Sequence, residues 1–185
     1  MGIALVHACA RRGAEVTLVC GSVQVPVLNP FGTIHRIDAL SAQEMYEACM
    51  EEWHKMNSAI LCAAVADFAP SQTASEKIKK QAGQTELTLH LSTTPDIARS
   101  LGEHKQPGQR LIGFALETEH EQENALSKME RKHLDAIILD SLREEGAGFG
   151  VDTNRVTIFH PNQQQTALPI QSKAVTAESI IDALF

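Results

Sequence analysis

The sequence has no excess of basic residues, no secretory signal and no apolar run long enough to cross a membrane. Lys and Arg total 16 against 23 Asp and Glu, for a formal net charge of −7. Proteins that coat nucleic acid or bind a membrane surface normally carry the opposite sign. A membrane-spanning helix needs roughly 20 consecutive apolar residues. The composition therefore argues against nucleic acid and membranes as partners, and we expect a cytoplasmic protein.

Closely spaced cysteine pairs are also absent. The 4 cysteines, Cys9, Cys20, Cys49 and Cys62, are scattered through apolar stretches, and no CxxC pair exists. Disulfide frameworks belong mainly to small secreted chains, and structural zinc sites use closely spaced ligands. This spacing predicts buried free thiols in a reducing compartment.

Several common site signatures are missing. The sequence contains no Walker A motif, no HExxH and no GxSxG. The glycine-rich stretch at residues 146–150 (GAGFG) comes late and is not followed by a helix pattern, so it is not a dinucleotide fingerprint. What is present is a chain of 185 residues, 43% of them hydrophobic, which suits one α/β domain over residues 1–185.

Strand and helix patterns alternate along this chain. Short apolar, β-branched runs predict buried strands, and the capping box Ser41-Ala-Gln-Glu44 opens a helix. Thr94 and Pro95 read as the N-cap and first residue of another helix. The predicted strands cover residues 15–20, 33–37, 59–64, 111–116, 136–139 and 156–159, and the longer helices cover 1–12, 41–56, 119–133 and 176–184. This alternation predicts a Rossmann-like, doubly wound, mainly parallel sheet.

Three stretches depart from a simple parallel sheet. A helix over residues 1–12 followed by a buried strand implies an earlier strand for the sheet, and we expect the domain to lack it in the sequence as given. Residues 86–91 (ELTLHL) and 156–159 (VTIF) alternate apolar and polar side chains, which does not fit the sheet interior. This pattern predicts an antiparallel flap or a dimer contact, with 86–91 as a half-exposed strand. Residues 65–70, between strand patterns, are expected to form a loop.

Candidate binding residues follow the predicted strands, because ligands of open α/β sheets bind beyond the carboxyl ends of strands. Asp67 is placed to bind a metal, a sugar hydroxyl or a base amine, or else to cap its own loop. Lys77-Ile78-Lys79-Lys80 suits phosphate neutralisation, or else is a solvated surface cluster. Lys128 and Lys132 share a helical face at i,i+4, which suits an anion between them. The alternative is surface pairing with nearby acids, which are Glu121, Glu123 and Glu130.

The order of the motifs is more specific than any single one. They are AAVADF (63–68), KIKK (77–80), PDI (95–97), GFALET (113–118) and GFGVDTN (148–154). In this order they resemble the bacterial phosphopantothenoylcysteine synthetase family of coenzyme A biosynthesis, over effectively the whole chain. That form is usually the C-terminal half of a bifunctional protein with a flavin-dependent decarboxylase half. FMN is therefore expected only if such a half lies upstream.

The resemblance implies a ligase that uses CTP, Mg²⁺, 4′-phosphopantothenate and cysteine. The pantothenate carboxylate would attack the α-phosphate of CTP, releasing pyrophosphate and leaving an acyl-cytidylate. The cysteine amine would then attack the acyl carbon, giving 4′-phosphopantothenoylcysteine and CMP. The family is dimeric, and residues 86–91 resemble part of its dimerisation flap.

The resemblance also assigns residues. Lys77 would contact the triphosphate and act in forming the acyl-cytidylate, and Ala63 and Ala64 would let the substrate pass close to the backbone. The implied nucleotide-binding residues are Leu61, Cys62, Ala63, Asp67, Lys77, Pro95, Asp96, Ile97, Ala98, Phe114, Lys128 and Lys132. The metal ligands stay unassigned.

The sequence departs from the family at two points. The family's N-x-S-S-G-K-M-G segment precedes the first helix, and here only Met1-Gly2 correspond to it. We therefore expect the sequence as given to lack part of the phosphopantothenate site. Asp140 stands where relatives commonly have Asn, and its carboxylate would repel phosphate unless a metal intervened.

Two other functions remain open from the residues. One is an NAD(P)-binding oxidoreductase domain of Rossmann type, although Gly21-Ser22 follow strand 15–20 where an acidic ribose partner is expected. The other is a non-catalytic nucleotide-binding or dimerisation module.

Overall fold

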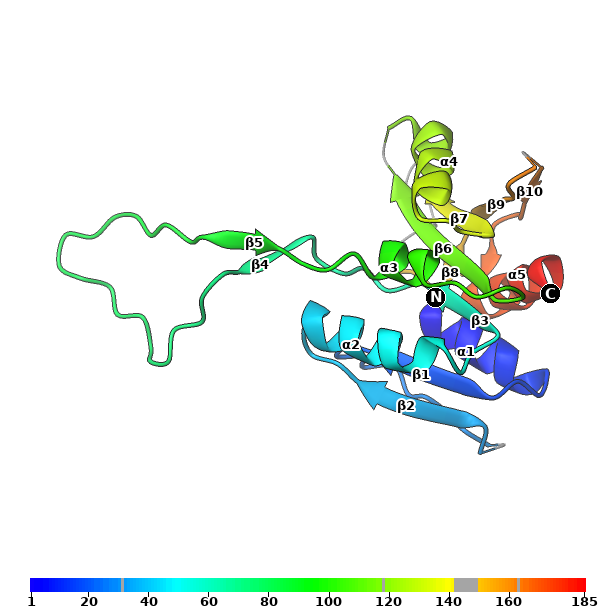
Figure 1. Ribbon diagram of the computed structural model, residues 1–185, viewed down its shortest axis with the longest axis horizontal. Helices are drawn as coiled ribbons and strands as arrows, with labels where there is room; N and C mark the ends of the chain where they lie inside the picture. Colours follow the sequence, from blue (N-terminus) through cyan, green and yellow to red (C-terminus); the bar gives the residue numbers. More distant parts are fainter. Residues whose placement is uncertain (31, 118, 142–149, 163) are drawn as a thin grey trace.

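The computed structural model describes residues 1–30, 32–117, 119–141, 150–162 and 164–185. Its helices and strands alternate along the chain, as predicted (Figure 1). The helices are α1 (Gly2–Arg11), α2 (Ala42–Trp53), α3 (Ile97–Glu103), α4 (Glu121–Arg131) and α5 (Lys173–Leu184). The strands are β1 (Val16–Cys20), β2 (Ile34–Asp38), β3 (Ser58–Leu61), β4 (Phe68–Pro70), β5 (Leu91–Thr93), β6 (Arg110–Glu117), β7 (Ala136–Ser141), β8 (Thr153–Asn154), β9 (Val156–Phe159), β10 (Gln165–Ala167) and β11 (Gln171–Ser172).

A five-stranded sheet in the order β10-β9-β7-β6-β3 forms the centre of the molecule. Strands β3, β6 and β7 run parallel, whereas β9 and β10 are antiparallel additions at one edge. The antiparallel direction predicted for 156–159 is thus confirmed, but its exclusion from the sheet interior was wrong, because Val156, Ile158 and Phe159 of β9 are buried. Leu111 and Ile112 of β6 and Ile137 and Ile138 of β7 are almost completely buried. Such continuous apolar runs are typical of parallel strands covered on both faces. The prediction of a parallel sheet interior is confirmed for these three strands.

Strands β1 and β2 form a separate parallel pair, with Val16 opposite Ile34 and Cys20 opposite Asp38. Among the described residues, this pair is not hydrogen-bonded to the five-stranded sheet. The structure thus confirms an α/β fold with a central sheet. It divides the predicted strands between the five-stranded sheet and the two-stranded β1–β2 sheet, so one continuous doubly wound sheet remains a prediction.

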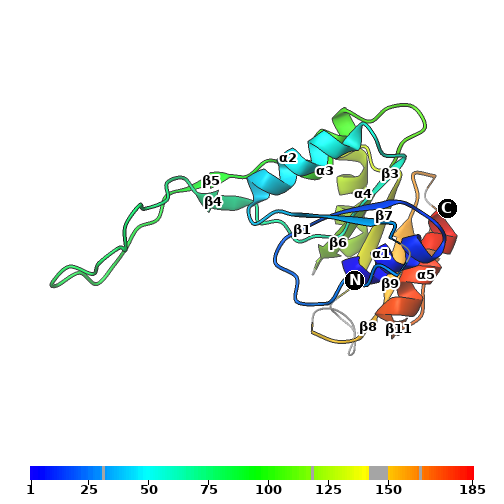
Figure 2. The same cartoon turned by 90° about the horizontal axis from the view of Figure 1, so that it is seen from below.

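Helices cover both faces of the central sheet (Figure 2). Helices α1 and α5 contribute Leu5, Ala8 and Ile180 to a core that contains Ile112 and Ile138 on one face. On the other face Trp53, Leu101 and Met129, from α2, α3 and α4, pack against inward side chains of β6 and β7. Burial of these two layers supplies the main driving force for folding.

Strands β4 and β5 begin a long arm that projects from the body of the molecule (Figures 1 and 2). The prediction of a strand at residues 86–91 was wrong in its bounds, because β5 covers only Leu91–Thr93 and pairs with Phe68–Pro70. The predicted loop at 65–70 likewise ends in a short strand. Apolar side chains on this arm are exposed, so the alternation of apolar and polar residues at 86–91 does not correspond to a face buried within one chain. The exposed apolar side chains are Phe68, Ile78, Leu87, Leu89 and Leu91.

Several element ends differ from the prediction. The capping box is confirmed, because Ser41 Oγ accepts from the Glu44 N–H and the Glu44 carboxylate accepts from the Ser41 N–H. In contrast, α3 is capped by Asp96, and Thr94 instead bonds to the preceding loop. Strand β3 stops at Leu61, three residues before its predicted end at 64. Helix α4 is shorter than predicted, and α5 begins at Lys173 rather than 176 because Ser172 caps it.

The four cysteines are free, as predicted, although only Cys20 is fully buried. Within the described ranges no helix combines the length and the apolar character that a membrane crossing requires.

Candidate functional site

A cavity of about 1950 Å³ extends from the space between β1 and β3 to the carboxyl ends of β3 and β6. It is lined by every predicted nucleotide-binding residue except Lys77. These lining residues are Leu61, Cys62, Ala63, Asp67, Pro95, Asp96, Ile97, Ala98, Phe114, Lys128 and Lys132. Ala63, one of the two predicted substrate residues, lines it as well, but Ala64 does not. The structure therefore gathers residues that are up to 71 positions apart in the sequence (Leu61 to Lys132).

Two segments at the cavity mouth are joined by hydrogen bonds from one threonine. Thr94 Oγ1 donates to the Ala66 carbonyl at 2.6 Å, and the Thr94 N–H donates to the Asp67 carbonyl at 3.0 Å. These bonds place the loop after β3 beside the start of α3. Within the described part of the chain the Asp67 carboxylate has no hydrogen-bond partner, so it does not cap its own loop. Asp67 is thus an exposed acceptor at the edge of the cavity.

Asp96 connects α3 to the end of α4. Its Oδ1 accepts from the Arg99 backbone N–H at 3.1 Å and from Lys132 Nζ at 3.0 Å. Partial burial acts to raise the pKa of Asp96, but the hydrogen bonds from Arg99 and Lys132 outweigh it and hold the pKa below its usual value. Asp96 is therefore ionised at neutral pH and keeps the Lys132 ammonium in place.

Lys128 and Lys132 do not share a single anion. Lys128 lies in α4 and pairs with Glu117 at the end of β6, whereas Lys132 is the C-cap residue of that helix and pairs with Asp96. The predicted alternative partners Glu121, Glu123 and Glu130 were wrong for both lysines. Each ammonium is held by its own carboxylate at the cavity wall, so an entering anion would meet two oriented cations.

Gly102 explains how Lys132 comes so near to α3. A Cβ atom at this position would lie 2.1 Å from the Lys132 carbonyl oxygen, so only glycine permits this backbone approach. Lys105, two residues after the end of α3, donates to both Asp135 carboxylate oxygens at 2.9 Å, which further ties α3 to the segment after α4. The spacing of the two lysines gave no sign of this packing.

Phe114 lies in the middle of β6, on the sheet face covered by α1 and α5. It is half-buried and lines the cavity. Helices α3 and α4, which carry Ile97 and Lys128, pack against the opposite face. A ligand that touches both Phe114 and Lys128 must therefore pass over the carboxyl ends of the strands, where α/β sheets bind ligands.

Lys77 is not brought to the cavity within one chain. It lies on the arm beyond β4, exposed to solvent, in the segment that Figure 1 shows projecting from the body. Ile78, beside it, is 60% exposed. Its predicted catalytic role thus needs either a movement of the arm or a second copy of the chain.

A buried polar group at Asp140 was recognised in the sequence only as a departure from relatives. Its Oδ2 accepts from Asn154 Nδ2 at 3.0 Å, and its buried Oδ1 has no hydrogen-bond partner among the residues that the structure describes. Burial raises the pKa of Asp140, although the bond from Asn154 and the charge of Lys173 partly counter it. Asn154 belongs to the motif at 148–154 and is completely buried, but its bond to Asp140 was not predicted, because a buried Asn in a polar stretch has no sequence signature.

The structure says little about the glycine-rich stretch and the metal ligands. Residues 146–149 of the glycine-rich stretch lie outside the described residues. Among the described residues, no group of three or more His, Cys, Asp or Glu side chains is arranged to hold a metal ion.

Comparison with known proteins gives a consistent picture. Residues 1–185 match the family model described as the DNA/pantothenate metabolism flavoprotein C-terminal domain. The chain is 40% identical over 184 residues to the coenzyme A biosynthesis bifunctional protein CoaBC of Bacillus subtilis, covering 100% of this chain and 44% of that protein. It is 48% identical over 182 residues to a cysteine/cysteine sulfinic acid decarboxylase of an unknown prokaryotic organism, covering 98% of this chain and 49% of that protein. The chain thus spans about half the length of the curated relatives it matches.

Solved structures agree with the sequence comparison. The C-terminal domain of a CoaBC protein superposes with a TM-score of 0.77 at 32% identity, covering 98% of this chain and 80% of that one. A Cab2 variant in complex with phosphopantothenate-cysteine has a TM-score of 0.71 at 16% identity, covering 98% and 74% of the two chains, which shows a common fold. The family model matches residues 1–185, and the identity to CoaBC extends over the whole of this chain. This chain therefore belongs to the family of the DNA/pantothenate metabolism flavoprotein C-terminal domain.

Proposed function

We propose that this chain is a phosphopantothenate–cysteine ligase domain that uses CTP and works in coenzyme A biosynthesis in the cytoplasm. The observation that carries the proposal is the single cavity lined by the separate motif residues at Leu61–Asp67, Pro95–Ala98, Phe114 and Lys128. Its family membership favours this activity over a nicotinamide-dependent oxidoreductase.

The nucleotide would lie across the carboxyl ends of β3 and β6. Its base would contact Phe114 and the residues that begin α3, and Asp67 would accept from an amine or sugar hydroxyl. Its phosphates would reach Lys128 and Lys132, whose ammonium groups are already held at the wall by Glu117 and Asp96. Because those cations are oriented before the ligand arrives, little reorganisation accompanies phosphate binding.

The chemistry needs positioning and charge neutralisation more than a protein nucleophile. In the first step a carboxylate oxygen of 4′-phosphopantothenate bonds to the α-phosphorus of CTP, and the bond from that phosphorus to pyrophosphate breaks. In the second step the cysteine nitrogen bonds to the acyl carbon, CMP leaves with the electron pair of the C–O bond, and the amine proton passes to solvent. Ala63 and Ala64, with their small side chains, would leave room for the reacting carboxyl group.

Lys77 would stabilise the negative charge that develops in the first step. The arm that carries it is exposed and bears apolar side chains, of which Leu87 is 59% and Leu89 61% exposed. We propose that these side chains pack against a second copy, giving a homodimer in which the arm brings Lys77 to a cavity. Packing of the arm would also remove the free edges of β4 and β5 from solvent.

Mg²⁺ would enter with the triphosphate as its counterion. No step above depends on a metal held by side chains, since the described residues offer no such cluster.

The test is a binding titration with CTP, ATP and NADPH, followed by a pyrophosphate assay in this chain joined to the N-x-S-S-G-K-M-G segment of a relative. The proposal expects CTP to bind and pyrophosphate release to require 4′-phosphopantothenate. Binding of NADPH in preference to both CTP and ATP would favour an NAD(P)-binding oxidoreductase domain. Binding of CTP without any pyrophosphate release would indicate a non-catalytic nucleotide-binding module.

A further inference from the structure

A second, smaller cavity of about 220 Å³ adjoins the large one and is lined by Asp96, Arg99, Arg131 and Lys132. Asp96 and Lys132 line both cavities, whereas Arg99 and Arg131 line only the smaller one. We call this smaller cavity the arginine pocket. The ion pair between Lys132 and Asp96 therefore stands between the large cavity and a separate group of cations.

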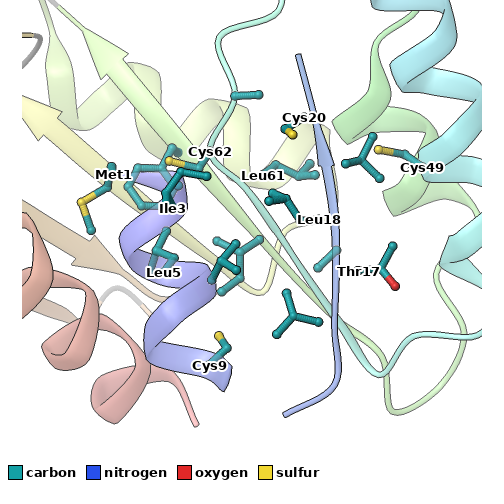
Figure 3. A pocket seen from close by; sticks show the side chains of 18 of the residues that line it. Met1, Ile3, Leu5, Cys9, Thr17, Leu18, Cys20, Cys49, Leu61 and Cys62 are labelled. Carbon is teal, nitrogen blue, oxygen red and sulfur yellow. The ribbon is translucent and has the colours of Figure 1, made fainter. Parts of the chain in front are cut away.

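The walls of the two cavities differ in chemistry. Figure 3 shows Leu5, Leu18 and Leu61 around one part of the large cavity, and apolar walls of this kind offer a charged group no hydrogen bonds. The arginine pocket instead has three cations and one carboxylate in its wall, in a chain whose formal net charge is −7. Its volume of about 220 Å³ is below the roughly 300 to 1,000 Å³ of pockets for drug-sized ligands. Size and charge together suit a small inorganic anion.

Arg131 and Lys132 both have hydrogen-bond donors to spare. Arg131 Nε donates to the Ser127 carbonyl at 3.4 Å, and no carboxylate in the described part of the chain lies within ion-pair distance of its guanidinium. Its two terminal nitrogens are therefore available for a paired contact with phosphate oxygens. Lys132 uses one of its three ammonium donors on Asp96.

Arg99 reaches the same pocket from α3. It pairs with Glu103 at 2.8 Å, but the two side chains are 65% and 46% exposed, and such surface pairs are weak. Stabilisation of the helix dipole accounts for cations at the carboxyl end of α4, where Arg131 and Lys132 lie. It does not account for Arg99, which lies in the first turn of α3, where the dipole disfavours a cation. Asp96 opposes an anion, but the Lys132 ammonium and the Arg99 backbone N–H already bind its carboxylate.

We propose that the arginine pocket binds inorganic pyrophosphate through Arg131, Arg99 and Lys132. The identity of this ligand rests on the proposed function, in which pyrophosphate is released in the large cavity beside Lys132. Because Lys132 lines both cavities, the leaving pyrophosphate meets cationic donors from one cavity to the next. Its two linked phosphate groups allow it to contact Lys132 and an arginine at the same time. The pocket thus holds the first product of the reaction after it has left the nucleotide site.

The test is a calorimetric titration of pyrophosphate into the chain saturated with CTP, without 4′-phosphopantothenate, so that no reaction takes place. Because CTP then fills the nucleotide site, we expect pyrophosphate to bind at the arginine pocket alone. Arg131→Gln should weaken this binding at least about tenfold, since a paired, charge-assisted contact is lost. The same variant should keep the CTP affinity of the parent, because Arg131 does not line the large cavity. Arg36→Gln, which removes an exposed arginine from β2, is the matched control and should change neither affinity.

Three results would overturn the proposal. The first is a CTP-saturated chain that binds no pyrophosphate, which would confine pyrophosphate to the nucleotide site. The second is equal pyrophosphate affinity of Arg131→Gln and the parent, even with a lower Tm, which would leave Arg131 a structural role only. The third is inorganic phosphate that binds as tightly as pyrophosphate, since the proposal expects the single phosphate group to bind more weakly. Failure of CTP itself to bind would instead contradict the proposed function, and the same pyrophosphate titrations of the free chain and of Arg131→Gln would then decide on the pocket.

Discussion

Lys132, the residue that caps the end of α4, donates a 3.0 Å hydrogen bond to Asp96, the residue that caps the start of α3. This bond links two helices on the same sheet face at the rim of the cavity. Lys132 is thereby held in one orientation, while Asp96 remains partly exposed. The pair stands where the proposed triphosphate would enter.

Lys132→Gln should weaken CTP binding about tenfold, because one oriented cation is lost while Lys128 stays in place. Calorimetric titration measures the change. Arg36→Gln removes a similar exposed cation from β2, where Arg36 pairs with Asp38, and serves as the matched control. Equal affinities of the Lys132 variant and the parent protein would exclude a phosphate role for Lys132.

Lys77→Gln should reduce acyl-cytidylate formation by roughly a hundredfold, the loss typical of one strong electrostatic donor in a transition state. CTP affinity should fall much less, because the cavity residues still hold the nucleotide. Pyrophosphate release is measured in this chain joined to the N-x-S-S-G-K-M-G segment of a relative. Lys80→Gln, in the same cluster, should stay near the parent rate, and a Lys77 variant that also stays within a few-fold would remove it from the mechanism.

Leu87→Asp with Leu89→Asp should abolish the proposed homodimer, because two charges would be buried where apolar side chains meet. Light scattering should change from about twice the 20.2 kDa chain mass to the single chain mass. Thr88→Asp, between them on the arm, adds a charge at a polar position without removing an apolar side chain and should leave the dimer intact. A parent protein with the mass of one chain at micromolar concentration would contradict the prediction.

Asp140→Asn should raise Tm at pH 7. Burial raises the pKa of Asp140 in the folded state above the ordinary value of 3.8, so folding disfavours its ionised form. The resulting loss in the free energy of unfolding is absent below the pKa of Asp140 in the unfolded chain. It grows as the pH rises towards the higher pKa in the folded protein and is complete above that pKa. The Tm gain should therefore shrink towards pH 4. Glu15→Gln, which removes an exposed carboxylate, is the matched control and should leave Tm at pH 7 nearly unchanged. A gain that did not depend on pH would show that ionisation is not its cause.

Local patterns in the sequence predicted the interior well. The apolar run at 136–139 and the capping box at Ser41 and Glu44 depend on neighbouring residues, and both are present in the structure. The arm was predicted less well, because alternation at 86–91 indicates a half-buried surface without identifying what covers it. The ion pair of Lys128 with Glu117 was missed for a related reason. It depends on how α4 packs against β6, which helical spacing does not contain.

The position of Phe114 and Lys128 on opposite faces of β6 has an evolutionary consequence. Phe114, which would contact the proposed base, is set by packing against α1 and α5, whereas Lys128 and Lys132, which would meet the phosphates, are set by α3 and α4. Substitutions that repack the α1 and α5 layer around Phe114 could change the preferred base while the two lysines keep their arrangement. Base preference and phosphate affinity can thus diverge separately among descendants of one ancestral domain.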